Sequence, residues 1–364
     1  MLNELSLKDF KCFTDVKLPM AALTVLSGYN GAGKSSALQP LLLLAQTSRM
    51  GRWDLSALLE MPLNGDLVRL GTVGDVLPSN ASDMSFQFVS SDAYLGLRAS
   101  AKAGERSLTR RSFDGEGAWE DLLESIGRLV YLSAVREGTI EAFPTPDRLG
   151  EGTHDVGMDG RFASYWYHQL ADSEVEAARL CPGEPADIFR KQLDAWLGRL
   201  APGASANVLA VPATSTFALQ FKTSDIGEWR RPANVGYGLT YSFPIIVALL
   251  AAKPGATVII DSPEAHLHPR AQSQMGRMLA NFAAAGIQVI VETHSDHVLN
   301  GIRIAVRDKV LRHDHTSLLF FSGASESSHG VTMPRLDRHG RIDEWPEGFF
   351  DQSEKDVAHL AGWA

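Results

Sequence analysis

The chain has 364 residues, of which 45% are hydrophobic and 21% charged, so it can bury a large core as an ordinary globular protein does. A formal net charge of −9 argues against a surface that binds nucleic acid throughout, so any DNA contact must be local or come from a partner. Two cysteines, Cys12 and Cys181, cannot build a disulfide framework, and no signal peptide is seen, so we expect a cytoplasmic protein. The apolar run 41–45 is too short to cross a membrane, and no membrane partner is expected.

The first elements expected are strands that lead into a glycine-rich loop. Apolar and polar residues alternate over 2–10, and apolar bursts follow at 16–18 and 23–26. The next residues have the spacing GxxxxGK[ST], and a helix is expected from this loop to about Arg49. In that pattern the glycines let backbone N–H groups converge on phosphate oxygens, the lysine reaches the β and γ phosphates, and the serine hydroxyl ligates Mg²⁺.

The sequence therefore predicts a nucleoside triphosphate site at this loop, with Lys34 supplying positive charge to the phosphates from a solvent-facing loop. Ser35 is the candidate Mg²⁺ ligand. The candidate nucleotide-binding residues are Gly28, Asn30, Gly31, Ala32, Gly33, Lys34, Ser35 and Ser36.

The middle of the chain is less specific. Alternation predicts a strand over 84–97, an apolar run predicts another over 129–133, and helices are expected over 162–180 and 186–200. Between Lys102 and Arg111 a polar and basic segment is interpreted as an exposed turn or arm.

Two apolar strands are expected near the other end, over 257–261 and 287–291, with a helix over 270–285 between them that ends at Gly286. Asp261 ends the first strand, where a carboxylate can hold Mg²⁺, and Glu292 follows the second. Strand, helix and strand with polar residues at the strand ends is the doubly wound pattern of nucleotide enzymes.

Small residues over 234–242 precede an apolar helix expected over 243–251, and a helix N-terminus of this kind is a second candidate anion-binding surface. The histidines also allow a zinc hypothesis, because HxH and HxxH spacings occur in metal sites, although no cysteine supports it. They are His266, His268, His294 and His297.

Taken together, the motifs GYNGAGKSS, NVGYGLTYSFPII, VIIDSPEAHLHP and ETHSDH resemble the ABC-type ATPase heads of the SMC, RecF and OLD superfamily. The sequence is most similar to short bacterial AAA ATPases whose tail carries a WPEGFFDQ-like segment, here 345–352, and the segment YLSAVR at 131–136 also resembles that family. The resemblance implies an α/β P-loop NTPase with an ABC-type doubly wound core, an N-terminal antiparallel β portion and an inserted helical subdomain. The implied segments are 1–130 with Walker A, the inserted 131–222, 223–312 with Walker B, and a tail at 313–364.

By this resemblance the Walker A loop is 28–36, Walker B is 258–261, the D-loop region is 265–268, and His294 is the switch histidine. The counterpart of the ABC signature is 234–240, and its candidate nucleotide contacts are Asn234, Gly236, Gly238 and Thr240. ABC ATPases usually place a catalytic glutamate directly after the Walker B aspartate, but this chain has Ser262 there, which cannot act as a general base at neutral pH. Hydrolysis should be slow or should use another carboxylate, so the candidate catalytic set is Lys34, Asp261, Glu264, Glu292 and His294.

The resemblance implies an enzyme that uses ATP and Mg²⁺, forms a homodimer in which each signature segment closes over the other subunit's phosphate loop, and switches an effector protein encoded nearby. The setting implied is prokaryotic antiviral defence or DNA maintenance. A RecF-like clamp that holds DNA through 102–111, Arg303, Arg307 and Lys309 is the alternative, and a scaffold with a structural nucleotide is a third. Nuclease activity is not expected, because the acidic residues Asp337, Asp343 and Asp351 show no paired strand-end carboxylates of the kind found in OLD-type nucleases.

Overall fold

The computed structural model describes residues 1–50, 60–100, 102, 104–147, 154–224, 226–323 and 330–362. The chain divides into two compact units. The first unit comprises Met1–Gly127, Asp314–Asp337 and Arg341–Ala364, and the second comprises Arg128–His313 and Arg338–Gly340. The four segments implied by the resemblance remain a prediction. Among the described residues no helix is both long enough and apolar enough to cross a membrane.

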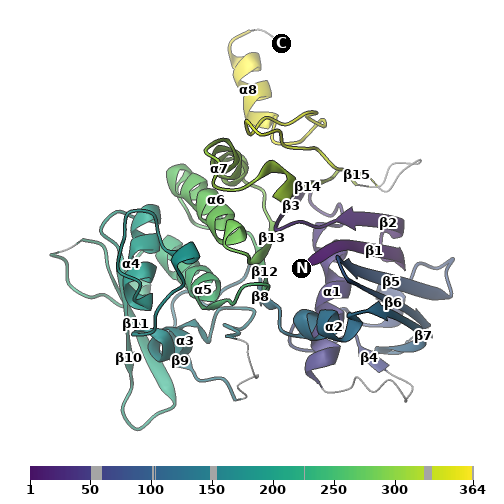
Figure 1. The fold of residues 1–364 in the computed structure, drawn as a ribbon, viewed down its shortest axis with the longest axis horizontal. Coiled ribbons are helices and arrows are strands. Elements are labelled where there is room, and N and C mark those ends of the chain that lie inside the picture. The colour runs from purple at the N-terminus through teal and green to yellow at the C-terminus, as the bar shows by residue number, and fades with distance from the viewer. Residues whose placement is uncertain are drawn as a thin grey trace. The chain divides into compact units, whose positions relative to one another are not determined.

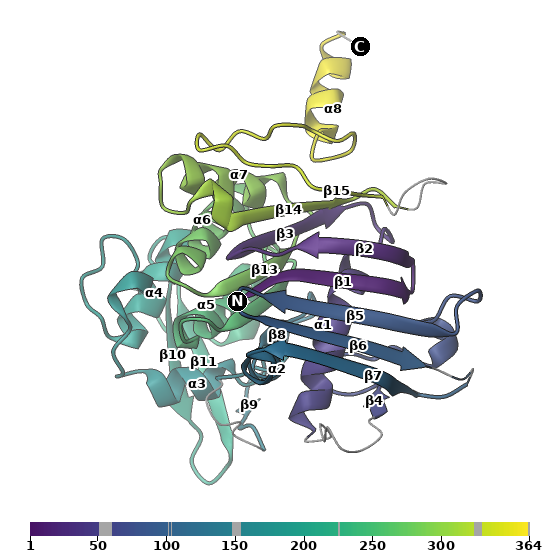
Figure 2. The same ribbon diagram turned by 45° about the vertical axis from the view of Figure 1, so that its right-hand side comes forward.

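The first unit contains an antiparallel sheet with the strand order β2-β1-β5-β6-β7-β4 (Figure 2). Its core includes Phe10 and Phe86, whose rings meet edge to face with centroids 5.4 Å apart. Helix α1 packs against helix α2 and against β4. The bounds are β1 Leu2–Phe10, β2 Phe13–Pro19, α1 Lys34–Arg49, β4 Glu60–Pro62, η1 Val73–Asp75, β5 Asp83–Ser90, β6 Ala93–Ser100, β7 Ser107–Gly117 and α2 Trp119–Gly127.

A second group of strands in this unit carries the phosphate loop. Strand β3 (Leu23–Gly28) pairs in parallel with β14 (Thr316–Phe321), and β14 pairs antiparallel with β15 (Val331–Thr332). The parallel register sets Gly28 opposite Phe321. Helix α8 (Gln352–Leu360) ends the described part of the unit.

The second unit contains the parallel strands β8 (Val130–Leu132), β12 (Thr257–Asp261) and β13 (Gln288–Glu292), with β12 in the middle. The first four residues of β12 and all of β13 are buried, as expected for parallel strands covered on both faces. Helices α5 (Tyr237–Ala251), α6 (Pro269–Ala284) and α7 (Asp296–Arg307) accompany these strands, and α6 packs along α7 (Figure 1). Gly286 follows the C-cap of α6 with φ +90°, so its predicted role as the residue after the helix is confirmed.

The remainder of the second unit is a mixed α/β region. An antiparallel sheet in the order β10-β11-β9 packs against α3 and α4, so 131–222 is less helical than expected. The strands of 205–222 went unrecognised, although their buried residues alternate. The bounds are β9 Phe143–Pro144, α3 Ala163–Leu170, η2 Ala177–Arg179, α4 Phe189–Leu200, β10 Ser205–Ala210, β11 Thr216–Lys222 and η3 Pro232–Asn234, and η4 is His313–His315.

Four predicted elements differ in their extent. The strand expected over 84–97 is the hairpin β5–β6, which turns at Ser91 and Asp92. The helix expected over 162–180 ends at Leu170, because the following residues bond to the segment before α4, for example Val175 N to Asp187 O at 2.7 Å. Helix α5 begins at Tyr237 rather than Phe243, so half of the signature-like segment lies in its first turn. The interpretation of 102–111 as an exposed turn or arm is wrong in part, because 107–111 belongs to β7 and pairs with β6 and β4.

Candidate functional site

The phosphate loop joins β3 to α1 in the first unit, and its glycines have conformations that other residues rarely adopt. Gly28 has φ +135°, and a Cβ there would lie 2.0 Å from the backbone oxygen of Phe321 on β14. Gly33 has φ +102°, and its Cβ would lie 2.7 Å from the Cys12 sulfur. Any other residue at these positions would be strained and would collide with its neighbours. The loop therefore has the backbone shape that a phosphate cradle requires.

Helix α1 begins at Lys34, directly after this loop. It has no acidic residue in its first turn, and no side chain among the described residues caps its N-terminus. The positive end of the helix dipole is therefore not neutralised by a carboxylate, and it favours a bound anion. Asn30, Gly31 and Ser35 are exposed around it. Ser36 and Gly33 are partly exposed, whereas Ala32 is buried.

The Lys34 side chain lies inside the loop rather than on its surface. It is 4% exposed, and Nζ donates to the carbonyl oxygens of Gly28 at 3.0 Å and Tyr29 at 2.9 Å. Folding of the loop back over the ammonium group explains the burial. The lysine charge is thus held inside the loop, within reach of an anion bound there.

The C-terminal segment of the first unit contacts the same loop. Tyr29 is 49% exposed, and its hydroxyl donates to the carbonyl oxygen of Glu347 at 3.4 Å. Gly348 has φ +81°, and a Cβ there would lie 1.9 Å from the Tyr29 hydroxyl oxygen. The tyrosine ring also meets Phe320 edge to face, with centroids 5.9 Å apart. The segment 345–352, which the sequence links to a particular family, is therefore packed on the phosphate loop.

We expect Gly348→Val to detach this segment from the loop, because the new side chain would overlap the Tyr29 hydroxyl. Limited proteolysis should then cleave the C-terminal segment faster. Gly104→Val is the matched control, since Gly104 has a similar φ of +87° but no atom of the described residues within 4 Å of its Cβ position. Equal cleavage rates in the two variants would contradict the contact.

The strand ends of the second unit bring several predicted residues together. Asp261 and Glu292 are opposite each other in the parallel register of β12 and β13. Ser262 follows with φ +50°, donates from its backbone N–H to Glu292 O at 2.8 Å, and donates from its hydroxyl to Asp261 Oδ1 at 2.9 Å. The serine side chain thus orients the aspartate.

Glu264 binds the segment that follows β13. Its Oε2 accepts a hydrogen bond from the Thr293 hydroxyl at 2.8 Å, and its Oε1 accepts one from the His294 backbone N–H at 2.8 Å. His294 is exposed, whereas Glu292 is 6% exposed. The Glu264 carboxylate therefore holds the segment 293–294 in place through one side-chain and one backbone donor.

The signature-like segment packs on the turn after β12. A Cβ on Gly238 would lie 2.9 Å from the backbone oxygen of His266, so glycine is required for this close approach within one chain. Thr240 is buried, and its hydroxyl donates to Tyr237 O at 3.0 Å. Asn234 and Gly236 are exposed, and they are the members of the segment most accessible to a ligand.

Arg136 also reaches these strand ends, and sequence reasoning did not assign it a role. It donates to the backbone oxygens of Asp261 and Ser262. Burial raises the pKa of the neighbouring Tyr131, as do the nearby carboxylates of Asp261 and Glu292. The signal that could have found Arg136 is a lone arginine ending the apolar strand segment YLSAVR, which was noted only as a family resemblance.

Three family models match parts of the chain. Residues 1–91 match "AAA ATPase domain", residues 170–300 match "AAA domain, putative AbiEii toxin, Type IV TA system", and residues 311–360 match "Protein of unknown function (DUF3696)". The chain is 24% identical to the OLD nuclease of Thermus scotoductus strain SA-01, over 94% of this chain and 68% of that protein.

Solved structures share the fold. A structure of an Smc head bound to the C-winged helix domain of ScpA is 16% identical, covers 93% of this chain and 98% of its own, and has a TM-score of 0.52. An Smc head with an extended coiled coil, bound to the C-terminal domain of ScpA derived from Pyrococcus furiosus, is 12% identical, covers 99% of both chains, and has a TM-score of 0.52. The family models and the OLD nuclease relative support a likeness of the chain to the SMC/RecF/OLD superfamily of ABC-type ATPases. The predicted resemblance and the mixed α/β P-loop fold are thereby confirmed.

Two of the four histidines of the zinc hypothesis, His266 and His268, have separate environments. The His266 ring lies between those of Tyr237 and Tyr241, with centroid distances of 5.2 and 4.7 Å. His268 caps α6 by accepting the Arg270 N–H at 3.3 Å. Across the described ranges no group of three or more His, Cys, Asp or Glu side chains is arranged to hold a metal ion. The geometry therefore gives the zinc hypothesis no support.

Arg303 of the DNA-clamp interpretation and the three aspartates of the nuclease interpretation have structural partners. Arg303 donates to Gly340 O and to Asn300 Oδ1, both at 2.8 Å. Asp337, Asp343 and Asp351 accept backbone N–H groups in the turns of the C-terminal segment. The OLD nuclease relative leaves nuclease activity open.

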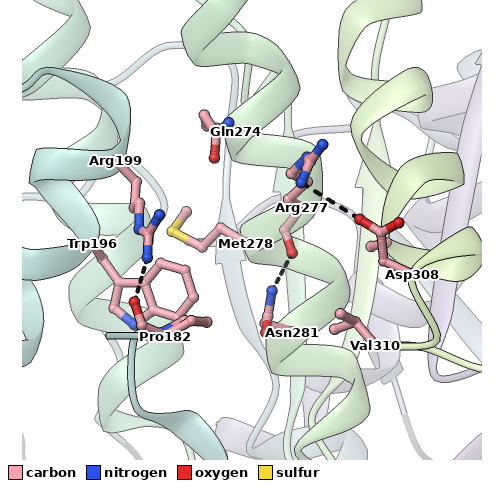
Figure 3. A pocket seen from close by; sticks show the side chains of 10 residues that line it. Pro182, Trp196, Arg199, Gln274, Arg277, Met278, Asn281, Asp308 and Val310 are labelled. Atoms are coloured by element: carbon pink, nitrogen blue, oxygen red, sulfur yellow. Dashed lines mark hydrogen bonds and ion pairs between the residues drawn. The ribbon is translucent and has the colours of Figure 1, made fainter. Parts of the chain in front are cut away.

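A separate hollow of about 170 Å³ lies over α4, α6 and α7 (Figure 3). Trp196 and Met278 line it, together with two arginines that already have protein partners. Arg199 donates to the Pro182 carbonyl oxygen, and Arg277 lies 3.7 Å from Asp308. Because these charges are engaged, we assign the hollow no ligand.

Proposed function

We propose that this chain binds ATP with Mg²⁺, hydrolyses it slowly, and uses ATP-dependent dimerisation to switch a partner protein. The observation that carries the proposal is the phosphate loop, in which positive-φ glycines, an uncapped helix N-terminus and the Lys34 ammonium converge. A mixture of the purified chain with ATP and Mg²⁺ should release inorganic phosphate slowly. Absence of both ATP binding and phosphate release would refute the proposal.

The side-chain chemistry of two predicted residues suits a magnesium nucleotide. Hydroxyl and carboxylate oxygens are the ligands that Mg²⁺ prefers, and we propose the Ser35 hydroxyl and the Asp261 carboxylate for this role. The Ser262 hydroxyl donates to Asp261 Oδ1, which orients the carboxylate. When bound, Mg²⁺ would neutralise phosphate charge that develops during transfer.

Slow turnover follows from the absence of a glutamate at position 262. A serine hydroxyl is not a general base at neutral pH, and this one is already a donor to Asp261. A chain that binds ATP tightly and hydrolyses it slowly can remain in its ATP-bound state, which suits a switch better than a motor.

Support for dimerisation comes from the signature-like segment. Its Asn234 and Gly236 are exposed at the N-terminal end of α5, where backbone N–H groups could meet a phosphate of a second subunit. Gly238 is a poor probe of this contact, because a side chain there would collide with His266 in the same chain.

Gly236 is a clean probe, since no atom lies within 4 Å of its Cβ position and its φ of −64° suits any residue. We expect ATP with Mg²⁺ to convert the wild type and the control Gly236→Ala to dimers, as measured by light scattering. Gly236→Glu should remain monomeric, because its carboxylate would face phosphate, but it should still bind ATP. A single assembly state under all nucleotide conditions would count against closure in trans.

A partner or effector in prokaryotic defence or DNA maintenance is the wider role that we propose. It is supported by one family description that names a toxin–antitoxin system, by the OLD nuclease relative, and by Smc heads that bind ScpA. The DNA-clamp alternative has weaker support, because its basic arm is part of strand β7. Salt-dependent DNA binding by the purified chain would favour it again.

A further inference from the structure

Arg136 lies just after β8 in the second unit and has no part in the function proposed above. Its side chain is only 3% exposed. Nη1 donates to the backbone oxygen of Ser262 at 3.3 Å, and Nη2 donates to the backbone oxygen of Asp261. The guanidinium therefore spans two successive carbonyl groups of the turn that follows β12.

This turn is a strained one that needs an external support. Ser262 has φ +50° and His266 has φ +61°, a region that costs a residue with a side chain about 1 kcal/mol or more. Hydrogen bonds from a charged donor to both carbonyls stabilise the turn against relaxation. Without Arg136, the two carbonyl groups would lose these donors and the turn would be freer to relax.

The buried charge of Arg136 is balanced locally. Burial lowers the pKa of Arg136 to about 10, and the nearby carboxylates of Asp261 and Glu264 oppose that shift, so the group stays protonated at neutral pH. A buried charge is tolerated only where such compensation exists. Its Nε atom is buried and has no hydrogen-bond partner among the described residues, so the group retains one unused donor.

Arg136 also contacts the helix that carries the signature-like segment. Its guanidinium carbon lies 5.8 Å from the centre of the Tyr241 ring on α5. The same ring meets His266 edge to face at 4.7 Å, and His266 is in the turn after β12. One side chain thus touches both the first turns of α5 and the strand end that carries Asp261.

We propose that Arg136 is a positioning residue that sets Asp261 for Mg²⁺ and couples this carboxylate to the N-terminal turns of α5. This inference rests on the proposed binding of magnesium nucleotide. A movement of α5, such as dimer closure would produce, would reach Asp261 through Tyr241 and Arg136. Lysine cannot replace Arg136 fully, because its ammonium is a point charge that lacks the planar fork needed for two carbonyls.

The test compares Arg136→Lys and Arg136→Met with Arg190→Met, which removes an exposed arginine of the same unit. Binding of a fluorescent ATP analogue is measured in EDTA and then across a Mg²⁺ titration. We expect affinity in EDTA to stay near that of the wild type, while half-saturation by Mg²⁺ rises about 10- to 100-fold in Arg136→Met, as for other groups that orient metal ligands. The Mg²⁺ concentration at half-saturation of Arg136→Lys should lie between those of the wild type and Arg136→Met. That of Arg190→Met should equal the wild-type value.

Hydrogen exchange without nucleotide supplies a second readout, which also serves if Arg136→Met does not fold. Arg136→Lys should raise the rate of hydrogen exchange both in the turn 261–268 and in the first turns of α5. Arg190→Met should raise the rate in neither segment. Unchanged Mg²⁺ dependence, or an equal loss of affinity in EDTA, would overturn the positioning role. A wild type that binds no nucleotide refutes the proposed function instead, and faster exchange in only one of the two segments overturns the coupling.

Discussion

Lys34→Ala is expected to weaken ATP binding by about 10- to 100-fold, because a hydrogen bond to a charged group is worth about 1.5–3 kcal/mol. The lysine is the cation placed inside the phosphate loop, where Nζ lies on the carbonyl oxygens of Gly28 and Tyr29. A bound triphosphate would offer this ammonium a charged partner in place of two neutral ones. Isothermal titration with ATP measures the loss.

The design must separate phosphate binding from folding, since Lys34 is buried and its removal takes a donor from two carbonyls. Lys17→Ala is the matched control, because Lys17 is exposed on β2 in the same unit. AMP lacks the β and γ phosphates and should bind both variants alike. An unchanged melting temperature with equal ATP affinity in Lys34→Ala and the wild type would exclude the phosphate-loop assignment.

The elements that sequence reasoning predicted well are those with strong local signals. Strand β12 has the predicted bounds, Thr257–Asp261, because a run of apolar residues ends in a carboxylate. Helix α1 ends at the predicted Arg49, and Gly286 follows α6 as expected. In each case the residues that determine the element are close in sequence. The spacing of apolar residues and the residues at the ends of the element therefore predict its bounds.

The features that the sequence did not reveal concern residues whose conformation depends on distant partners. The basic segment at 107–111 forms strand β7 because β6 and β4 offer it hydrogen-bonding partners, which its polar composition does not indicate. Gly238 stays a predicted nucleotide contact, but its close approach to His266, 28 positions along the printed sequence, is not indicated by the motif. The burial of Lys34 by its own loop is also absent from the motif, which contains only residue types and their spacing.

Arg136 illustrates the limit for the site. Its hydrogen bond to Asp261 joins residues 125 positions apart. Neither the residue types nor their spacing predicts such a contact. The position of Asp261 at a strand end, together with the phosphate loop elsewhere in the chain, predicts its role. The residue that supports this aspartate is found only in the folded structure. Supporting residues of this kind carry no motif of their own.

The second large effect concerns the carboxylate that replaces the missing glutamate at position 262. Glu292 is our first candidate, because it ends β13 opposite Asp261 and is only 6% exposed. Loss of a general base costs about a hundred- to ten-thousandfold in rate. Glu292→Gln should therefore lower turnover at least about a hundredfold and leave ATP binding nearly intact, as measured by phosphate release at saturating ATP. Glu141→Gln, which changes an exposed glutamate of the same unit, is the control.

Glu264 is the competing candidate, and the structure favours a different task for it. Its two oxygens accept hydrogen bonds from Thr293 and from the His294 backbone, so it holds the switch-histidine segment and has less capacity left to take a proton. Glutamine at 264 keeps one acceptor, so Glu264→Gln should reduce turnover less than Glu292→Gln does. Ser262→Glu should raise turnover if the turn has ABC geometry, since a carboxylate would then stand where these enzymes usually carry one. Wild-type turnover in Glu292→Gln, combined with loss of turnover in Glu264→Gln, would transfer the role of general base to Glu264.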